Sequence, residues 1–153
     1  MSDKKVAVVT GSAAGLGKSI ATRLAQDGFA VVLHDINADN LARAKAEFDQ
    51  NDWQNIAVQG NVANRADQFR LAEEAVKAFG RLDVWVNNAG VESVGTFLAL
   101  DEQEIDRVLA VNVKGVIFGT QAAAEQMKKQ KTVSKIINAC SIAGHESYEM
   151  LSL

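Results

Sequence analysis

Proline is missing from the 153-residue sequence, although ordinary usage of about 5% would supply roughly seven. Cysteine is nearly missing too, since Cys140 stands alone and excludes both an internal disulfide and a cysteine-based metal cluster. This usage fits a reducing compartment, so we expect a cytoplasmic protein. No uncharged apolar run reaches the length of a transmembrane helix, and the run after Lys5 is too short for a secretory signal. We therefore expect neither a membrane span nor a metal site.

An excess of charge of one sign is also missing. The 16 Lys and Arg residues against 19 Asp and Glu residues give a formal net charge of −3, and no basic cluster occurs. Nucleic acid and anionic membranes attract basic patches, so we expect neither as a partner. Hydrophobic residues make up 48% and charged residues 23%, which is ordinary globular usage and excludes global disorder. The length fits a single domain over residues 1–153.

Short apolar runs alternate with segments of helical periodicity along the chain. Continuous apolar runs are typical of parallel strands that are buried on both faces. We expect strands at residues 5–10, 29–33, 56–58, 82–86 and 133–139, and helices at residues 15–28, 38–50, 64–79 and 101–129. The alternation predicts an α/β fold of the Rossmann type, with a doubly wound parallel sheet of about five strands. The last dozen residues, 142–153, are expected to be loop.

Two of these helices begin with polar residues at capping positions. Asn64 is followed by Asp67, and Asp101 by Glu104, a spacing that resembles a capping box. The last helix is apolar on nearly every side over residues 108–118. This pattern is typical of a buried helix, often one that contacts another subunit.

A glycine-rich turn joins the first strand to the first helix. Gly11, Gly15 and Gly17 stand in a Gly-x-x-x-Gly-x-Gly pattern, with Leu16 between the last two. Glycine lets the backbone bend tightly and approach a ligand closely. The N-terminus of the following helix presents N–H groups and a positive dipole end to a pyrophosphate. We therefore assign Gly11, Gly15, Leu16 and Gly17 to a dinucleotide-binding site.

Two other interpretations of this turn stay open. The glycines can serve the bend alone, without a ligand. Alternatively, Gly17-Lys18-Ser19 resembles the end of a P-loop, which binds nucleoside triphosphates. The spacing from Gly11 is one residue too long for a P-loop, and Ser12 occupies a position that needs glycine. We therefore expect Lys18 to be a solvated side chain.

An acidic residue, Asp35, ends the second strand, 18 residues after Gly17. In a dinucleotide-binding fold, a carboxylate here accepts hydrogen bonds from ribose hydroxyls and repels a 2′-phosphate. Residues 12–16 and 36–37 contain no lysine or arginine, so NAD is favoured over NADP. A turn or helix-capping role for Asp35 is the alternative, and the neighbouring His34 is expected to be structural.

The sequence Asn-Asn-Ala-Gly at residues 87–90 follows the fourth strand. Together with the glycine pattern, it resembles the short-chain dehydrogenase/reductase family over essentially the whole chain. The resemblance implies that this motif stabilises the centre of the sheet and that Asn88 and Gly90 line the adenosine side of an NAD site. It also implies an adenine contact for Asn61 and Val62, where the family usually has Asp-Val.

Asn112 and Ser141 match two catalytic residues of that family. By resemblance, Ser141 hydrogen-bonds the substrate carbonyl, and Asn112 supports a water chain that feeds a proton relay. On physical grounds alone, a mid-helix asparagine needs a partner and is as readily structural, while Ser141 is a polar residue beyond a strand end where α/β sheets bind ligands. We expect Cys140 to be a small buried side chain and His145 to be at most a pocket residue.

The family's acid–base pair, Tyr-x-x-x-Lys, does not occur in the 153 residues. The only tyrosine is Tyr148, and Ser152 stands four residues later. Free tyrosine has a pKa of about 10, so a neighbouring lysine is needed for acid–base work near neutral pH. The family's spacing puts the pair at or just beyond Leu153. We therefore expect a truncated product or a fragment of a longer protein, with a domain that is incomplete at its C-terminus and a sheet that stops before the family's last strands.

Within the family, residues 27–31, 113–117 and 135–145 are most similar to the diacetyl/acetoin reductases, also called 2,3-butanediol dehydrogenases. The resemblance implies an NAD(H)-dependent oxidoreductase that reduces a small ketone or diketone by hydride transfer. Its partner is then a small carbonyl or alcohol substrate, and its full-length form is expected to be a homo-oligomer. The alternative is a catalytically inactive dinucleotide-binding fragment.

Overall fold

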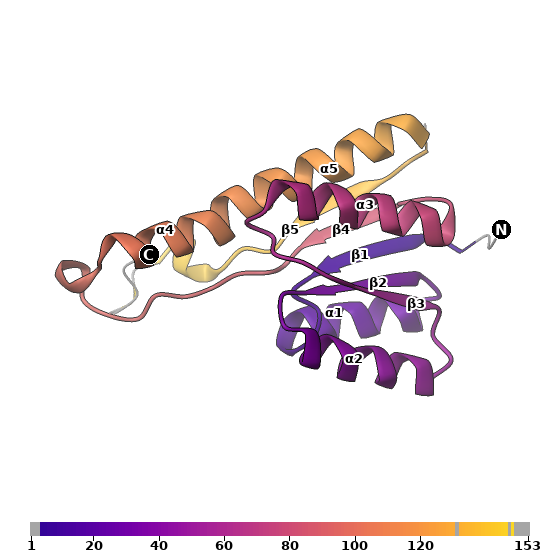
Figure 1. The fold of residues 1–153 in the computed structure, drawn as a ribbon, viewed down its shortest axis with the longest axis horizontal. Helices are drawn as coiled ribbons and strands as arrows, with labels where there is room; N and C mark the ends of the chain where they lie inside the picture. Colours follow the sequence, from indigo (N-terminus) through magenta and orange to yellow (C-terminus); the bar gives the residue numbers. More distant parts are fainter. Residues whose placement is uncertain (1–3, 131, 147, 149–153) are drawn as a thin grey trace.

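The structure is a computed structural model that describes residues 4–130, 132–146 and 148, and within these ranges strands alternate with helices (Figure 1). The strands are β1 (Val6–Thr10), β2 (Ala30–Asp35), β3 (Asn55–Gln59), β4 (Val84–Asn87) and β5 (Lys135–Asn138). The α-helices are α1 (Gly15–Gln26), α2 (Ala38–Gln50), α3 (Arg65–Phe79), α4 (Glu102–Leu109) and α5 (Gly115–Gln130). Shorter turns are η1 (Phe97–Ala99), the π-helical η2 (Ala110–Lys114) and η3 (Ile142–Gly144).

The five strands form one parallel sheet in the order β3-β2-β1-β4-β5. β1 lies at the centre, with Val8 opposite Val32 of β2 on one side and opposite Trp85 of β4 on the other. The chain builds outward from β1 to β3 and then crosses back to β4. The Rossmann-type fold with a five-stranded parallel sheet, expected from the sequence, is confirmed.

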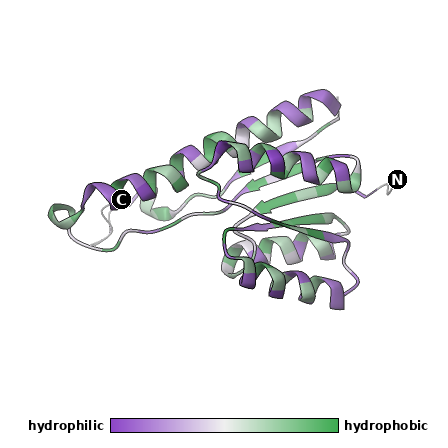
Figure 2. Cartoon of the chain, viewed as in Figure 1, coloured by the Kyte–Doolittle hydropathy of each residue, from purple (hydrophilic) through white to green (hydrophobic). Residues whose placement is uncertain are grey.

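Helices cover both faces of the sheet (Figure 1). α1 and α2 pack on one face, against β1, β2 and β3, while α3 and α5 lie side by side on the other. α4 continues the line of α5 beyond the end of the sheet (Figure 1). Figure 2 shows hydrophobic strands sandwiched between helices that carry hydrophilic residues on their outer sides.

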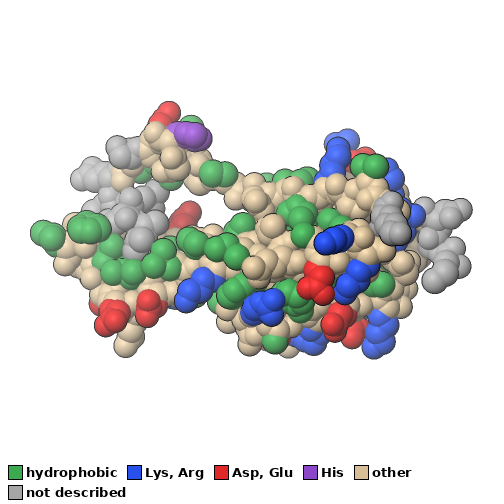
Figure 3. Space-filling view, turned by 90° about the horizontal axis from the view of Figure 1, so that it is seen from above, with side chains coloured by type: hydrophobic (Ala, Val, Ile, Leu, Met, Phe, Trp, Pro, Cys, Tyr) green, Lys and Arg blue, Asp and Glu red, His purple; other side chains and the backbone are tan. Residues whose placement is uncertain are grey.

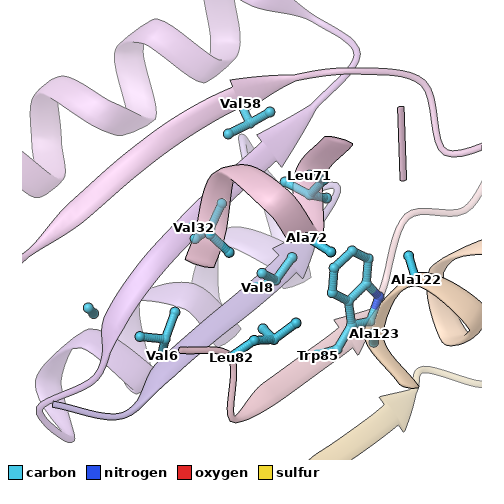
Figure 4. Packing of buried hydrophobic residues seen from close by; sticks show 12 residues of the cluster. Val6, Val8, Val32, Val58, Leu71, Ala72, Leu82, Trp85, Ala122 and Ala123 are labelled. Carbon is cyan, nitrogen blue, oxygen red and sulfur yellow. The ribbon is translucent and has the colours of Figure 1, made fainter. Parts of the chain in front are cut away.

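Two hydrophobic clusters fill the space between these layers. In the first, the fully buried Trp85 packs against Ala122 and Ala123 of α5 (Figure 4). Neighbouring residues of β2 go to opposite clusters, with Val32 facing α3 and Leu33 facing α1 and α2. This two-residue alternation, with both sides apolar, explains why the strands read as unbroken hydrophobic runs.

Three of the α-helices begin at residues whose side chains accept a backbone N–H of the first turn, namely Asn37, Asn64 and Asp101. Of the two hydrogen bonds in the capping box predicted at the start of α3, the one accepted by Asp67 is wrong. The carboxylate of Asp67 accepts from the backbone N–H of Asn61 at 2.9 Å, not from that of Asn64. The reason is local, because the Asn64 N–H already donates to the carbonyl oxygen of Asn61.

The single helix expected over residues 101–129 contains a π-helical turn, η2, between α4 and α5. Small residues bring α5 close to the sheet, since a Cβ on Gly119 would overlap the side-chain oxygen of Asn87. The sequence predicted a buried helix here, but the outer side is open in the described chain. The exposed apolar side chains on that side are Leu109, Val113 and Ile117.

β5 is an edge strand of the described sheet and is shorter than the expected strand at residues 133–139. The segment that follows it is exposed, and this includes Cys140. The expectation of a buried Cys140 is therefore wrong, because no described element covers the chain beyond the edge strand. The expected loop at residues 142–153 begins with the short turn η3, and residues 147 and 149–153 lie outside the described residues.

Candidate functional site

A cleft with a volume of about 1160 Å³ opens at the carboxyl ends of the strands. In α/β sheets this is the edge that binds ligands, at the point where the strand order changes direction. Ten of the eleven predicted site residues line the cleft, and Gly15 is the exception. The ten are Gly11, Leu16, Gly17, Asp35, Asn61, Val62, Asn88, Gly90, Asn112 and Ser141.

The glycine-rich turn is tightly packed against its neighbours. Gly11 has a φ of 64°, and a Cβ there would lie 2.9 Å from the Cα of Ala89. A Cβ on Gly17 would overlap the carbonyl oxygen of Gly11 and the side-chain amide of Asn88. Ser12, which departs from the P-loop pattern, is fully buried and bonds to β2 through both its backbone N–H and its hydroxyl. The close approaches explain why glycine is required at residues 11 and 17.

The N-terminus of α1 has no side-chain cap, in contrast to α2, α3 and α4. Its N-cap residue is Ala14, and its first turn contains no acidic residue. Gly15 has a φ of 54° and open space where a Cβ would stand. An uncapped helix start with a positive dipole end favours an anion. Lys18 instead pairs with Glu47 of α2 and does not line the cleft, so it is not arranged as a P-loop lysine.

Asp35 stands at the end of β2 and lines the cleft. Its oxygens accept hydrogen bonds from the backbone N–H groups of Ala13 at 3.2 Å and Asn37 at 3.0 Å. A carboxylate oxygen has two lone pairs, so each oxygen keeps one for a ligand hydroxyl. The backbone bonds fix the direction of the side chain without saturating it.

His34, the residue before Asp35, is a buried residue of the cleft lining. Neither ring nitrogen has a hydrogen-bond partner among the described residues. Burial lowers the pKa of His34 to about 4, although the negative charges of Asp35 and Asp67 act in the opposite direction. The imidazole is therefore neutral near neutral pH. A Cβ on Gly60 would lie 2.9 Å from its Nε2, so the loop after β3 packs directly on this ring.

The loop after β3 forms the wall beside Asp35. The side chain of Asn61 accepts from the backbone N–H of Ala63 at 2.9 Å, which makes a local turn. The bond from the Asn61 N–H, followed by one from Arg70, holds the pKa of Asp67 below its ordinary value. Asp67 therefore stays ionised near neutral pH and holds the loop after β3 in place through its bond to the Asn61 N–H.

The segment after β4 is joined to β1 through Thr10. The hydroxyl of Thr10 accepts from the backbone N–H groups of Asn88 at 3.0 Å and Ala89 at 3.1 Å. The side-chain amide of Asn88 returns a bond to the Thr10 carbonyl at 2.9 Å. We predicted no role for Thr10 from the sequence, although it precedes the first glycine of the turn. The structure shows that it sets the spacing between the two motifs.

Asn87 organises a polar network at the centre of the sheet. Its side-chain oxygen accepts from the indole N–H of Trp85 at 2.7 Å. Its amide nitrogen donates to Asn138 of β5 at 2.8 Å and to Thr120 of α5 at 3.2 Å. Because β4, β5 and α5 meet at one side chain, the cleft has a rigid base.

Asn112 lies in the π-helical turn and binds the backbone of Val91. Its Oδ1 accepts from the Val91 N–H at 2.9 Å, and its Nδ2 donates to the Val91 carbonyl at 2.8 Å. The structure thus gives the side chain the partner that a helical asparagine needs. π-helical turns are frequent at functional sites, and this one lies on the cleft wall.

Ser141 is exposed and also lines the cleft, at the N-cap of η3. Its hydroxyl oxygen accepts from the Ala143 N–H at 3.2 Å, which leaves the hydroxyl proton available to a ligand. His145 does not line the cleft. Tyr148 is exposed and its hydroxyl donates to Glu146 at 3.2 Å, so it too stands outside the cleft lining.

One charged residue on the cleft was not predicted from the sequence. Glu92 lines it two residues after the Asn-Asn-Ala-Gly motif. Arg107 of α4 donates to the Glu92 carbonyl at 2.7 Å and also pairs with Glu104. Hydrogen bonds from Arg107 and then Ser93 lower the pKa of Glu104, so the ion pair persists in mild acid. The position of Glu92 close to the Asn-Asn-Ala-Gly motif was the one sequence feature that could have predicted its place on the cleft.

Two kinds of feature are absent from the part of the chain that the structure describes. No group of three or more His, Cys, Asp or Glu residues there is arranged to hold a metal ion. No helix within those residues is both long and apolar enough to cross a membrane.

Residues 5–153 match the family model for short chain dehydrogenases, and the chain belongs to this family. It is 52% identical to a diacetyl reductase [(S)-acetoin forming] of Staphylococcus epidermidis over 147 residues, which are 96% of this chain and 57% of that protein. It is 41% identical to the Staphylococcus aureus protein of the same description, covering 100% of this chain and 59% of that protein. The chain thus spans less than two thirds of the length of these relatives.

Solved structures show the same relationship. A short-chain dehydrogenase/reductase from Burkholderia phymatum in complex with NAD matches with a TM-score of 0.94 and 34% identity, over 97% of this chain and 53% of that chain. A gluconate 5-dehydrogenase from Burkholderia cenocepacia in complex with NADP and tartrate matches with a TM-score of 0.89 and 28% identity, over 99% and 59%.

Proposed function

We propose that the protein containing this chain is an NAD(H)-dependent oxidoreductase that reduces a small ketone or diketone, diacetyl or acetoin. The observation that carries the proposal is the meeting of the glycine-rich turn, Asp35, Asn112 and Ser141 on one cleft. Similarity to the two staphylococcal diacetyl reductases supports the substrate class. Within that protein, residues 1–153 would belong to a single nucleotide-binding domain.

The residues of the cleft fit a dinucleotide. The uncapped start of α1 suits a pyrophosphate, and the spare lone pairs of Asp35 suit ribose hydroxyls. Asn61, Val62, Asn88 and Gly90 would line the adenosine side. The described cleft lining contains no lysine or arginine that would pair with a 2′-phosphate, which favours NAD over NADP. When bound, NAD(H) supplies or accepts the hydride.

The remaining residues of the cleft suit a carbonyl substrate. The free proton of the Ser141 hydroxyl is available to a carbonyl oxygen and would hold the carbonyl in a fixed orientation. Asn112 would act mainly through the backbone, because its side chain is engaged with Val91. A proton donor must still reach the carbonyl oxygen during reduction. In the family that donor is a tyrosine next to a lysine, and the 153 residues contain no such pair.

The missing pair favours one alternative, a catalytically inactive dinucleotide-binding fragment. Tyr148 is the only tyrosine, and its hydroxyl is engaged with Glu146 away from the cleft lining. The intact mass of the protein purified from its source separates the two proposals. A mass well above that of 153 residues supports the reductase, and a mass equal to it supports the inactive binder.

We also infer that the full-length protein is a homo-oligomer. Leu109, Val113 and Ile117 recur every four residues along one side of the α4–α5 helix, and each is 41–48% exposed. Hydrophobic side chains gather over this part of the molecule (Figure 3). A stripe of this kind is typical of a helix that packs against another subunit. Light scattering on the purified protein would measure the subunit number, and a monomer at micromolar concentration would refute the inference.

The function is tested by mixing the purified protein with NADH and diacetyl and following NADH absorbance and product formation. Consumption of NADH with formation of acetoin supports the reductase. Binding of NADH without turnover supports the inactive binder. Absence of NADH binding contradicts both.

Cofactor choice is tested by replacing Asp35. The Asp35→Asn variant keeps one acceptor oxygen but loses the charge, so its preference for NADH over NADPH should fall about tenfold, within the range of a hydrogen bond to a charged group. Asp39→Asn removes an equal charge from the first turn of α2, outside the cleft lining, and serves as the matched control. Fluorescence titrations with NADH and NADPH measure the ratio. An unchanged ratio in Asp35→Asn would remove the role assigned to this carboxylate.

A further inference from the structure

The charges on the cleft are of one sign. Asp35 and Glu92 are the carboxylates among its described lining residues, and none of those residues is a lysine or arginine. The one histidine in the lining, His34, is neutral near neutral pH because burial lowers its pKa to about 4. Asp35 lies at the end of β2, on the side assigned to the nucleotide. Glu92 lies on the segment after β4, which is bound to Asn112.

The position of Glu92 is fixed by hydrogen bonds to its own backbone carbonyl and to the backbone of the residue before it. Asn112 binds both the N–H and the carbonyl of the preceding residue, Val91. Arg107 donates to the carbonyl of Glu92 itself at 2.7 Å. Arg107 is held in turn by Glu104, in an ion pair at 2.6 Å. This double attachment keeps the Glu92 backbone on the cleft wall rather than in a free loop.

The Arg107 guanidinium does not neutralise the Glu92 side chain. Its described bonds go to the Glu104 carboxylate and to the Glu92 backbone carbonyl, and Arg107 itself does not line the cleft. Glu92 therefore brings a negatively charged residue to the lining of the cleft, on the segment that is bound to Asn112. An ionised carboxylate only accepts hydrogen bonds and repels a second carboxylate.

We propose that Glu92 is a specificity-determining residue that excludes anionic substrates, such as 2-oxo acids, and leaves neutral ketones unaffected. The inference rests on the proposed function and adds a cause for the choice of substrate. Diacetyl and pyruvate make a suitable comparison, because they have nearly the same shape and differ only in that a methyl group of diacetyl stands where pyruvate has a charged carboxylate oxygen. Two unit charges about 7 Å apart in a medium of dielectric constant about 40 to 80 disfavour binding by roughly three- to sevenfold.

The test uses the full protein as it is produced from its own gene. Ligand-observed NMR titrations with diacetyl and with pyruvate are made on the protein loaded with NAD+, which has no hydride to transfer. The variant is Glu92→Gln, which keeps the size of the side chain and removes its charge. Glu102→Gln is the matched control, because it removes a glutamate charge from the start of α4 at a residue that does not line the cleft.

The expected result is that Glu92→Gln binds pyruvate three to seven times more tightly and diacetyl as before. Glu102→Gln should leave both affinities unchanged. Raising the salt concentration should improve pyruvate binding to the original protein and have little effect on Glu92→Gln, because salt screens the repulsion. An unchanged ratio of the two affinities in Glu92→Gln, or an equal shift of both, would overturn the inference.

Measurements on the same protein distinguish a failure of this inference from a failure of the proposed function. If diacetyl binds but NADH is never consumed, the reductase proposal fails while the affinity ratio still tests Glu92. If NADH is consumed with diacetyl and the ratio does not respond to Glu92→Gln, the reductase stands and the role of Glu92 is refuted.

Discussion

Replacing His34 with leucine should remove part of the protein's sensitivity to acid. The side chain is 1% exposed, and its two ring nitrogens have no partner among the described residues. Burial lowers its pKa from 6.5 to about 4. In the unfolded chain the imidazole returns to its ordinary pKa, so the unfolded state binds a proton at a higher pH than the folded state.

The difference in the pKa of His34 between the folded and unfolded states sets the direction and the size of the change in the free energy of unfolding with pH. Between the two pKa values the unfolded state holds more protons, so the free energy of unfolding falls as the pH falls. At about 1.36 kcal/mol for each pH unit, the whole effect is roughly 3 kcal/mol. About 2 kcal/mol of it should be lost between about pH 7 and pH 5, a range in which Asp and Glu stay ionised. Below about pH 4 this histidine causes no further loss.

Urea unfolding followed by circular dichroism, at several values of pH, measures the effect. His34→Leu should lose about 2 kcal/mol less than the original protein over the same range. His145→Gln removes the exposed imidazole instead and is the matched control, since it leaves the buried His34 in place and should keep the loss of stability that His34 causes. Equal slopes for His34→Leu and the original protein would refute the reasoning, because the buried imidazole would then not be the group that titrates.

Two further changes test the geometry of the cleft. Gly17→Ala introduces a Cβ that overlaps the Gly11 carbonyl, so it should cost about 1–3 kcal/mol of stability and weaken NADH binding, as measured by urea unfolding and fluorescence titration. Gly95→Ala, where a Cβ meets nothing within 4 Å, is its control, and equal effects of the two would contradict the packing argument. Asn112→Ala removes both bonds to Val91 and should speed hydrogen exchange of the Val91 N–H about tenfold, and unchanged exchange would show that another group holds this segment.

The order of strands and helices was predictable because its signals are local. A run such as Val6–Val9 is buried on both faces and therefore lacks polar residues. The glycine-rich turn was equally readable, since close backbone approach at Gly11 and Gly17 excludes other residue types. The resemblance to one family then brought Asn112 and Ser141 to the same end of the sheet, where the structure has both on the cleft.

The features that the sequence did not predict depend on distant partners. The π-helical turn holds Asn112 against Val91, 21 residues earlier, and helical periodicity carries no trace of such a bond. The carboxylate of Asp67 was expected to serve its own helix start, but it binds the turn that precedes the helix. Cys140 was expected to be buried because small apolar residues usually are. Its burial depends on what adjoins the outer side of β5, and the described chain has nothing there.

A chain is synthesised from its N-terminus, and β1 lies at the centre of the sheet. The two hydrophobic clusters therefore become complete at different times during synthesis. The cluster beneath α1 and α2 draws all its buried members except Val86 from the first 48 residues. The cluster beneath α3 and α5 requires Trp85, Ala122 and Ala123, and the second edge of β1 stays unpaired until β4 emerges. Contacts between distant residues form more slowly than local ones. One layer of this protein can therefore consolidate on the ribosome while the other still awaits the residues that complete it.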